Sequence, residues 1–154
     1  MIRTSAALAI AVVLTGCASI VNDTTQPVKL ETRTAEGGMV EGADCKLGND
    51  YGVVSAKSGD TVQVRRSGKD LDITCRHPSN PDAVGRAISR ANAGLAGNIL
   101  IGGGIGAIID HSKGTAYTYP TWVQLVFGKT LVFDRSAEKD GQPVPGTEPT
   151  ANTK

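Results

Sequence analysis

The chain has 154 residues, of which 40% are hydrophobic, 4% aromatic and 20% charged. This length accommodates one small domain with appendages and excludes a large multidomain enzyme. The 16 Lys and Arg residues nearly balance the 15 Asp and Glu residues, and a net charge of +1 argues against a general affinity for nucleic acid or anionic lipid. The 19 glycines and 7 prolines indicate many turns or a closely packed backbone, not a long helical bundle.

The first residues have the pattern of a secretory signal peptide. Arg3 precedes an apolar run from Ala6 to Leu14, and the small residues Thr15 and Gly16 follow it. The run is about half as long as a membrane-spanning helix requires, so a retained transmembrane anchor is the weaker alternative. We therefore expect residues 1–16 to be a signal peptide.

The signal peptide leads directly to a cysteine in a recognisable context. The sequence Leu14-Thr15-Gly16-Cys17 resembles the bacterial lipobox, in which an apolar residue and two small residues precede an obligatory cysteine. The resemblance implies a diacylglyceryl group on the Cys17 sulfur, cleavage before Cys17 and acylation of the new amino terminus. Three acyl chains, at about 0.8 kcal/mol per buried methylene, would anchor the protein permanently.

The residue after Cys17 suggests which membrane holds the anchor. Ala18 stands where lipoproteins retained in the inner membrane commonly carry Asp. The resemblance therefore implies an outer-membrane anchor on the periplasmic face, with membrane lipid as the first partner and residues 17–26 as a lipidated tether.

Two cysteines remain, Cys45 and Cys75. A pair in an oxidising compartment suggests a disulfide. A metal or redox site is the alternative, but neither cysteine belongs to a C-x-x-C motif, and His77 and His111 show no ligand spacing. We predict a structural disulfide, no metal site, and no cofactor other than the covalent lipid.

Apolar residues alternate with polar ones between residues 26 and 76, as in half-buried β-strands. Val28 and Leu30 share one face, and turn signals separate the runs. The spacing predicts a small β-sandwich or meander, with its clearest hairpin from Val62 to Cys75. In that hairpin Cys75 lies on the core face with Ile73, within reach of Cys45 on a neighbouring strand.

This stretch resembles the small β-modules called PEGA domains. Residues 42–47 and the hairpin from Val62 to Cys75 match their pattern, whereas Ser55-Ala56-Lys57 stands where the middle turn carries proline. The resemblance implies a β-sandwich-like module.

The second half of the chain has a different pattern. Good helix formers predict a helix from Asp82 to Ala96, and alternation predicts strands again from Thr115 to Phe133. Residues 135–154 have no apolar run and are expected to form a disordered tail. The expected organisation is a β-rich periplasmic domain at 27–134 with a glycine-rich insert at 93–110. The fold class is therefore mainly β with a glycine-rich helical segment or hairpin, an α+β arrangement.

The glycine-rich insert is the most distinctive segment. Gly102-x-Gly104-x-x-Ala107 follows an apolar run, as in dinucleotide-binding enzymes, but no acidic residue follows at the place that receives a ribose. In a helix, every fourth residue would instead form a ridge without large side chains, or the glycines would bend a helical hairpin. The insert then packs under its own sheet, inserts into a membrane or contacts a partner. The ridge consists of Gly94, Asn98, Gly102, Gly106 and Asp110.

The segment 97–120, which follows a lipobox here, resembles a group of small proteobacterial lipoproteins of unassigned activity. Its distinctive parts are the glycine run and Tyr117-Thr118-Tyr119-Pro120. This resemblance implies an envelope location and a single domain, and it implies no reaction.

Candidate chemistry is sparse in the rest of the chain. Asp110-His111 is one adjacent acid and histidine, without a visible nucleophile to complete a triad. The aromatic residues Tyr117, Tyr119 and Trp122 belong to the core and a sheet edge, or they form a contact patch for a protein or glycan.

These observations favour a non-enzymatic outer-membrane lipoprotein that acts as a structural or interaction module with an envelope protein partner. A second hypothesis is a membrane-active factor that self-associates through its glycine ridge in exclusion or assembly. A third is a periplasmic hydrolase that depends on His111. None of the three involves nucleic acid.

Overall fold

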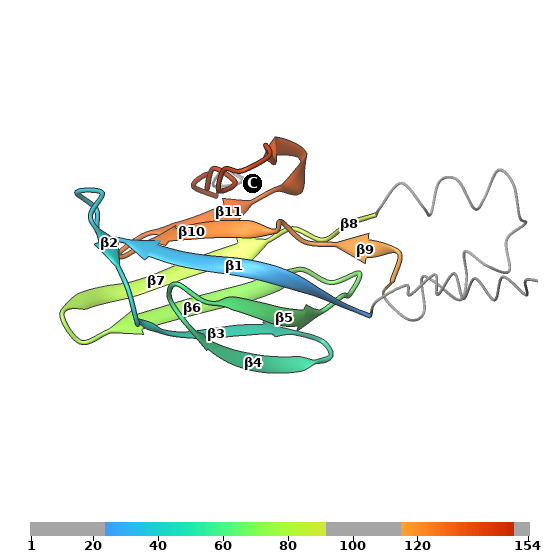
Figure 1. The fold of residues 1–154 in the computed structure, drawn as a ribbon, viewed down its shortest axis with the longest axis horizontal. Coiled ribbons are helices and arrows are strands. Elements are labelled where there is room, and N and C mark those ends of the chain that lie inside the picture. The colour runs from blue at the N-terminus through green and yellow to red at the C-terminus, as the bar shows by residue number, and fades with distance from the viewer. Residues whose placement is uncertain (1–23, 92–114, 150–154) are drawn as a thin grey trace, which may run out of the picture.

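The computed structural model describes residues 24–91 and 115–149. Within these ranges the protein is mainly β and has no α-helix, which confirms the predicted strand content. The predicted helical form of the glycine-rich insert lies outside the described residues. In chain order the elements are β1 (Thr25–Arg33), β2 (Met39–Val40), β3 (Asp44–Asn49), β4 (Gly52–Lys57), β5 (Thr61–Arg65), β6 (Leu71–His77), β7 (Asn80–Ala87), β8 (Arg90–Ala91), β9 (Tyr117–Thr118), β10 (Trp122–Val126), β11 (Thr130–Phe133) and the 3-10 helix η1 (Arg135–Ala137) (Figure 1).

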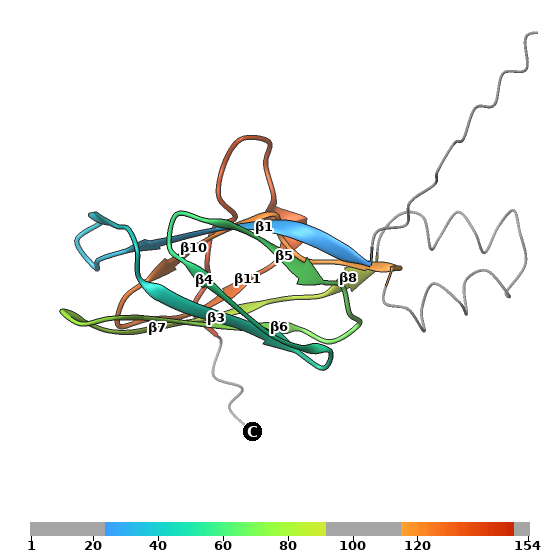
Figure 2. The ribbon, with the colours of Figure 1, turned by 60° about the horizontal axis from the view of Figure 1, so that its bottom comes forward.

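The strands form two main sheets that face each other as a sandwich (Figure 2). In one sheet β1 pairs in parallel with β10 on one edge, and with β5 and β2 on the other. The second sheet has the order β11-β7-β6-β3-β4, and β8 pairs with β9 apart from both. The alternating pattern places Val28 and Leu30 of β1 and Ile73 of β6 in the core between the sheets.

The predicted hairpin from Val62 to Cys75 is wrong. β5 pairs with β1, whereas β6 pairs with β3 and β7 in the other sheet. The loop between them carries the chain from one sheet to the other, so the fold is a sandwich and not a simple meander. Alternation specifies which face of each strand is buried, but it does not specify the neighbouring strand.

The predicted helix from Asp82 is also wrong, because β7 covers residues 80–87. Its inward positions are Ala83, Gly85 and Ala87, whose small size allows the two sheets to approach closely. A Cβ atom added at Gly85 would lie 3.0 Å from the Phe133 ring and 3.2 Å from a Leu125 methyl group. These alanines pack between the sheets, and this tertiary packing overrides their helix propensity.

The structure also differs from the predicted disordered tail over residues 135–149. Val144 is 1% exposed, and its N–H donates to the carbonyl oxygen of Trp122 on β10 at 2.9 Å. Thr147 exchanges two backbone hydrogen bonds with Val132 on β11. The tail therefore closes the side of the sandwich where β10 and β11 are the edge strands. A single apolar residue between prolines gave no periodic signal in the sequence.

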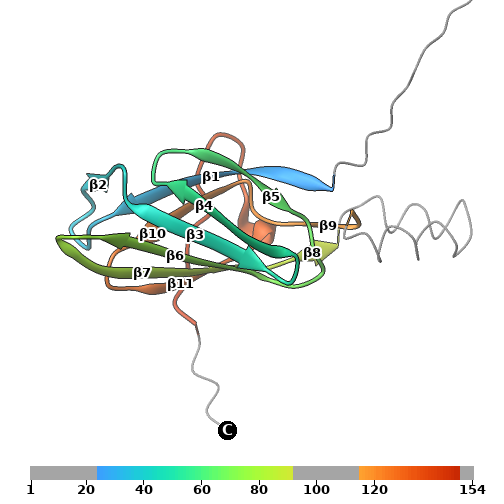
Figure 3. The same ribbon diagram turned by 90° about the horizontal axis from the view of Figure 1, so that it is seen from below.

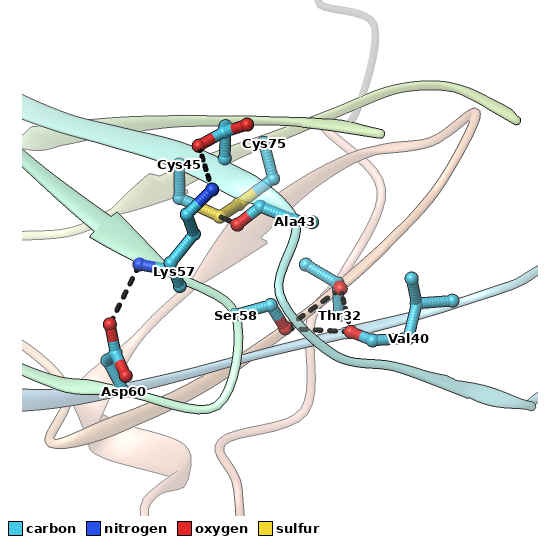
Figure 4. The surroundings of a disulfide bond; sticks show 9 residues. Thr32, Val40, Ala43, Cys45, Lys57, Ser58, Asp60 and Cys75 are labelled. Atoms are coloured by element: carbon cyan, nitrogen blue, oxygen red, sulfur yellow. Dashed lines mark hydrogen bonds and ion pairs between the residues drawn. A yellow bond between two sulfur atoms is a disulfide. The ribbon is translucent and has the colours of Figure 1, made fainter. Parts of the chain in front are cut away.

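The predicted disulfide is confirmed. Cys45 on β3 and Cys75 on β6 are register partners with Cα atoms 4.0 Å apart, and a sulfur–sulfur bond joins them. Both side chains are buried on the core face (Figure 4). The bond ties two central strands of the larger sheet, and it closes a loop that includes both crossings between the sheets, from β4 to β5 and from β5 to β6.

Replacing both cysteines by alanine should lower the free energy of unfolding by about 3 to 4 kcal/mol, because the bond restricts the unfolded chain over a loop of 30 residues. Chemical denaturation with and without a reductant measures this loss. The reductant should destabilise the natural protein and leave the double variant unchanged. Two free thiols in the folded protein, detected by mass after alkylation, would contradict the prediction.

Candidate functional site

One end of the sandwich collects every point at which the described chain meets residues 17–23 or 92–114. The start of β1, the end of β8 and the start of β9 lie together there (Figures 1 and 3). We call this the proximal end. The β1–β2 loop, which includes Glu36, lies at the opposite, distal end (Figure 1).

A buried glutamine joins the proximal strands. Gln26, 3% exposed, donates from its side-chain nitrogen to the Tyr119 carbonyl oxygen at 3.0 Å. Its side-chain oxygen accepts from the Tyr119 N–H at 2.9 Å. The Gln26 side-chain amide thus forms the two hydrogen bonds that the backbone of a neighbouring strand would form. It fixes the chain that follows the glycine-rich insert against the start of β1.

The Tyr119 side chain extends this network toward the β3–β4 turn and the β5–β6 loop. Its hydroxyl donates to the Lys69 carbonyl oxygen at 2.7 Å and accepts from the Asn49 side-chain nitrogen at 3.0 Å. The same nitrogen donates to the Arg65 carbonyl oxygen at 2.7 Å. Desolvation raises the pKa of the Tyr119 hydroxyl, so it remains a neutral donor that connects the β3–β4 turn with the β5–β6 loop.

Both strands that flank the insert are fixed to the domain. Arg90 and Ala91 of β8 pair with Thr118 and Tyr117 of β9. The Arg90 guanidinium forms a salt bridge with Asp134 after β11, and its hydrogen bond is the main reason that the pKa of this carboxyl lies well below its usual range. Residues 91 and 115 are thereby held at the same end of the sandwich, where Thr115 is 4% exposed.

The structure does not bring the three predicted aromatic residues into one exposed patch. Tyr119 is fully buried and Tyr117 is half-buried on β9. Trp122 is half-buried on β10, where the Lys29 ammonium lies 3.7 Å from the ring centroid. Tyr119 therefore belongs to the core. Core packing was one of the two alternatives that the sequence left open for these aromatic residues, and a contact patch was the other.

Several predicted site residues lie outside the described ranges. They include Cys17, His111 and the whole glycine ridge, namely Gly94, Asn98, Gly102, Gly106 and Asp110. Within the described ranges, no three His, Cys, Asp or Glu side chains are placed to share a metal ion, and no helix could cross a membrane.

Sequence reasoning missed Gln26, Asn49 and Arg65. A signal for Gln26 was present, since alternation puts it on the same buried face as Val28 and Leu30. A buried side-chain amide requires hydrogen-bond partners, so its position indicates where another segment of the chain must supply them. Asn49 and Arg65 carried no such signal, because their partners are distant in sequence.

Comparison with known proteins leaves the family open. No protein-family model matches the sequence, no curated protein is similar to it, and no solved structure matches its fold.

Replacing Gln26 by alanine should cost about 2 to 4 kcal/mol, because the buried Tyr119 N–H and C=O lose their partners. Urea unfolding near neutral pH measures the loss. The matched variant Gln63→Ala, at an exposed position of β5, should change stability by less than about 0.5 kcal/mol.

The variant Gln26→Glu tests the hydrogen-bond pattern itself. Ionised, the new carboxylate accepts from the Tyr119 N–H but cannot donate to its C=O; protonated, it does both. Burial raises its pKa in the folded state, so stability should be retained below about pH 4 and lost as the pH rises through the folded pKa. A loss of stability that does not depend on pH would contradict this role.

Proposed function

We propose that this protein is a lipoprotein that Cys17 anchors to the outer membrane, and that its β-sandwich holds the glycine-rich segment 93–110 beside that same membrane. It acts as a structural and interaction module and not as an enzyme. The observation that carries the proposal is the shared position of residues 24, 91 and 115 at the proximal end.

Chain length supports this orientation. Thr24 follows Cys17 by seven positions, and seven fully extended residues span at most roughly 25 Å. An acylated Cys17 would therefore keep the proximal end within that distance of the bilayer. Because both flanks of the insert leave from this end, the insert also starts and finishes near the membrane.

The fixed flanks give the sandwich a mechanical role. Hydrogen bonds between Gln26 and Tyr119, together with the Arg90–Asp134 salt bridge, hold the chain in place near residues 24, 91 and 115. A stable base of this kind presents an apolar segment, without charge from Ala93 to Ile109, toward lipid or toward an envelope protein in the same membrane. Self-association through the glycine ridge is the alternative use of the same placement.

The anchor is tested by Cys17→Ser in bacterial cells supplied with an alkyne-tagged fatty acid. We expect complete loss of label and release of the protein from the membrane fraction, because the thiol is the acceptor of the lipid. The double variant Cys45→Ser/Cys75→Ser should keep its label. Label that persists in Cys17→Ser would show that the anchor is elsewhere.

The orientation is tested by photo-crosslinking in cells, from a diazirine amino acid at position 101 or, as the matched control, at position 36. Position 101 should capture lipid or a distinct envelope protein, and position 36 should capture neither lipid nor that protein. Capture of a second copy would favour self-association. Crosslinks confined to the chain itself at position 101 would mean that the insert packs within its own domain.

A further inference from the structure

The side of the sandwich opposite the tail is open. β4 is the edge strand of the larger sheet and β5 is an edge strand of the smaller one, and they lie side by side (Figures 2 and 3). Between them is a groove of about 230 Å³, whose floor includes the buried Leu47 and Val64. The lining residues that matter for its chemistry are Leu47, Tyr51, Val53, Gln63, Val64 and Arg65.

Backbone groups on both walls of the groove point away from their own sheets. On β4, the Lys57 N–H donates to the Asp60 side chain and the Lys57 C=O accepts from the Asp60 N–H. The backbone groups of Lys57 therefore point away from β3. By the two-residue period of a strand, Ser55 and Val53 face outward as well. Among the described strands β4 pairs with β3 alone, which leaves this edge without a neighbour.

The same reasoning applies to β5. Arg66 donates to the Thr24 carbonyl oxygen and Asp60 accepts from Leu30, so even-numbered residues face β1. The backbone groups of Thr61 and Gln63 then face away from β1, and within the described ranges β5 pairs with no other strand. Unpaired edges of this kind are templates for an added strand.

The opposite opening shows how this fold accepts an extended segment. There the tail bridges the two sheets, with Val144 paired to β10 and Thr147 paired to β11. The Val144 side chain fills the space between the sheets and is 1% exposed. The β4–β5 opening offers the same two features, an apolar floor and outward backbone groups on both walls.

Charge favours an acidic occupant at one end of the groove. Arg65 is the one charged residue among those that line the groove, and its guanidinium carbon lies 4.4 Å from the centroid of the Tyr51 ring. It forms no salt bridge with any other residue of the described ranges. A carboxylate of a bound segment would form a salt bridge with the Arg65 guanidinium.

We propose that the β4–β5 groove binds an extended segment of a partner polypeptide, with apolar side chains at alternate positions and an acidic side chain beside Arg65. The segment adds backbone hydrogen bonds to the outward groups of Val53 and Gln63 and covers the Val53 side chain, which is 70% exposed. This interaction goes beyond the proposed membrane function, because it requires neither the acyl anchor nor the insert.

The test is selection of short random peptides displayed on phage against the purified full chain, followed by measurement of the best peptide by titration calorimetry. We expect enriched sequences with alternating apolar residues and a terminal Asp or Glu. In ¹⁵N-labelled protein, the amide signals of Val53, Ser55 and Gln63 should shift on binding.

Two variants assign the binding to the groove. Gln63→Pro removes an outward N–H that β1 does not use, so the protein should fold and binding should be lost. Arg65→Glu should weaken binding about tenfold or more, whereas Lys46→Glu, an equal charge change on an exposed residue outside the groove, should change it less than about twofold. Circular dichroism establishes that each variant is folded.

The proposal would be overturned by the absence of any enriched peptide, by binding that is insensitive to both Gln63→Pro and Arg65→Glu in folded protein, or by shifts confined to residues outside the groove. Self-association of the chain that Gln63→Pro abolishes would assign the groove to a second copy and would also overturn it. None of these results depends on Cys17, so they are separate from the test of membrane anchoring.

Discussion

Gln26 carries its amide into the core, where neither its N–H nor its oxygen can be left unsatisfied, and the backbone of Tyr119 supplies both partners. Because 93 residues separate the two, this pair joins the start of β1 to the chain that returns after the insert. The hydroxyl of the same tyrosine then ties in the β3–β4 turn and the β5–β6 loop. The arrangement of strands and loops at the proximal end depends on these hydrogen bonds between Gln26 and Tyr119.

The two sheets approach closely, so large side chains between them fit only where small residues lie opposite or beside them. Ala83, Gly85 and Ala87 make β7 thin enough for Phe133 and Leu125 to fit against it. A small domain has little stability to spare, and the buried disulfide between β3 and β6 adds to it where the chain passes from one sheet to the other. The tail completes the core by placing Val144 over one lateral opening.

Two surfaces with different chemistry follow from this architecture. The proximal end gathers the three points where the chain enters or leaves the described sandwich, and the hydrogen bonds of Gln26 with Tyr119 and the Arg90–Asp134 salt bridge hold them together. The β4–β5 side offers unpaired strand edges, an apolar floor and one cation. An anchored module that contacts the bilayer at one end and a partner along its flank would use both surfaces at once.

Local patterns in the sequence were sufficient for several features of this protein. Period-two alternation identifies most of β1, β5, β6 and β10, because a strand between core and solvent must alternate. The pairing of Cys45 with Cys75 followed from composition, since two cysteines remained once Cys17 was assigned to lipid. Turn residues such as Gly128, at a φ of +78°, mark where the chain reverses.

Tertiary structure alone decided which strands are neighbours, that β7 is a strand, and that the tail is packed. Alternation is the same whichever sheet a strand joins, so the crossing between β5 and β6 leaves no local signal. The alanines of β7 favour a helix in isolation, and contact with Phe133 and Leu125 selects the strand. The proximal network and the groove both join residues far apart in the chain, and interactions of this kind exist only once the sheets have packed.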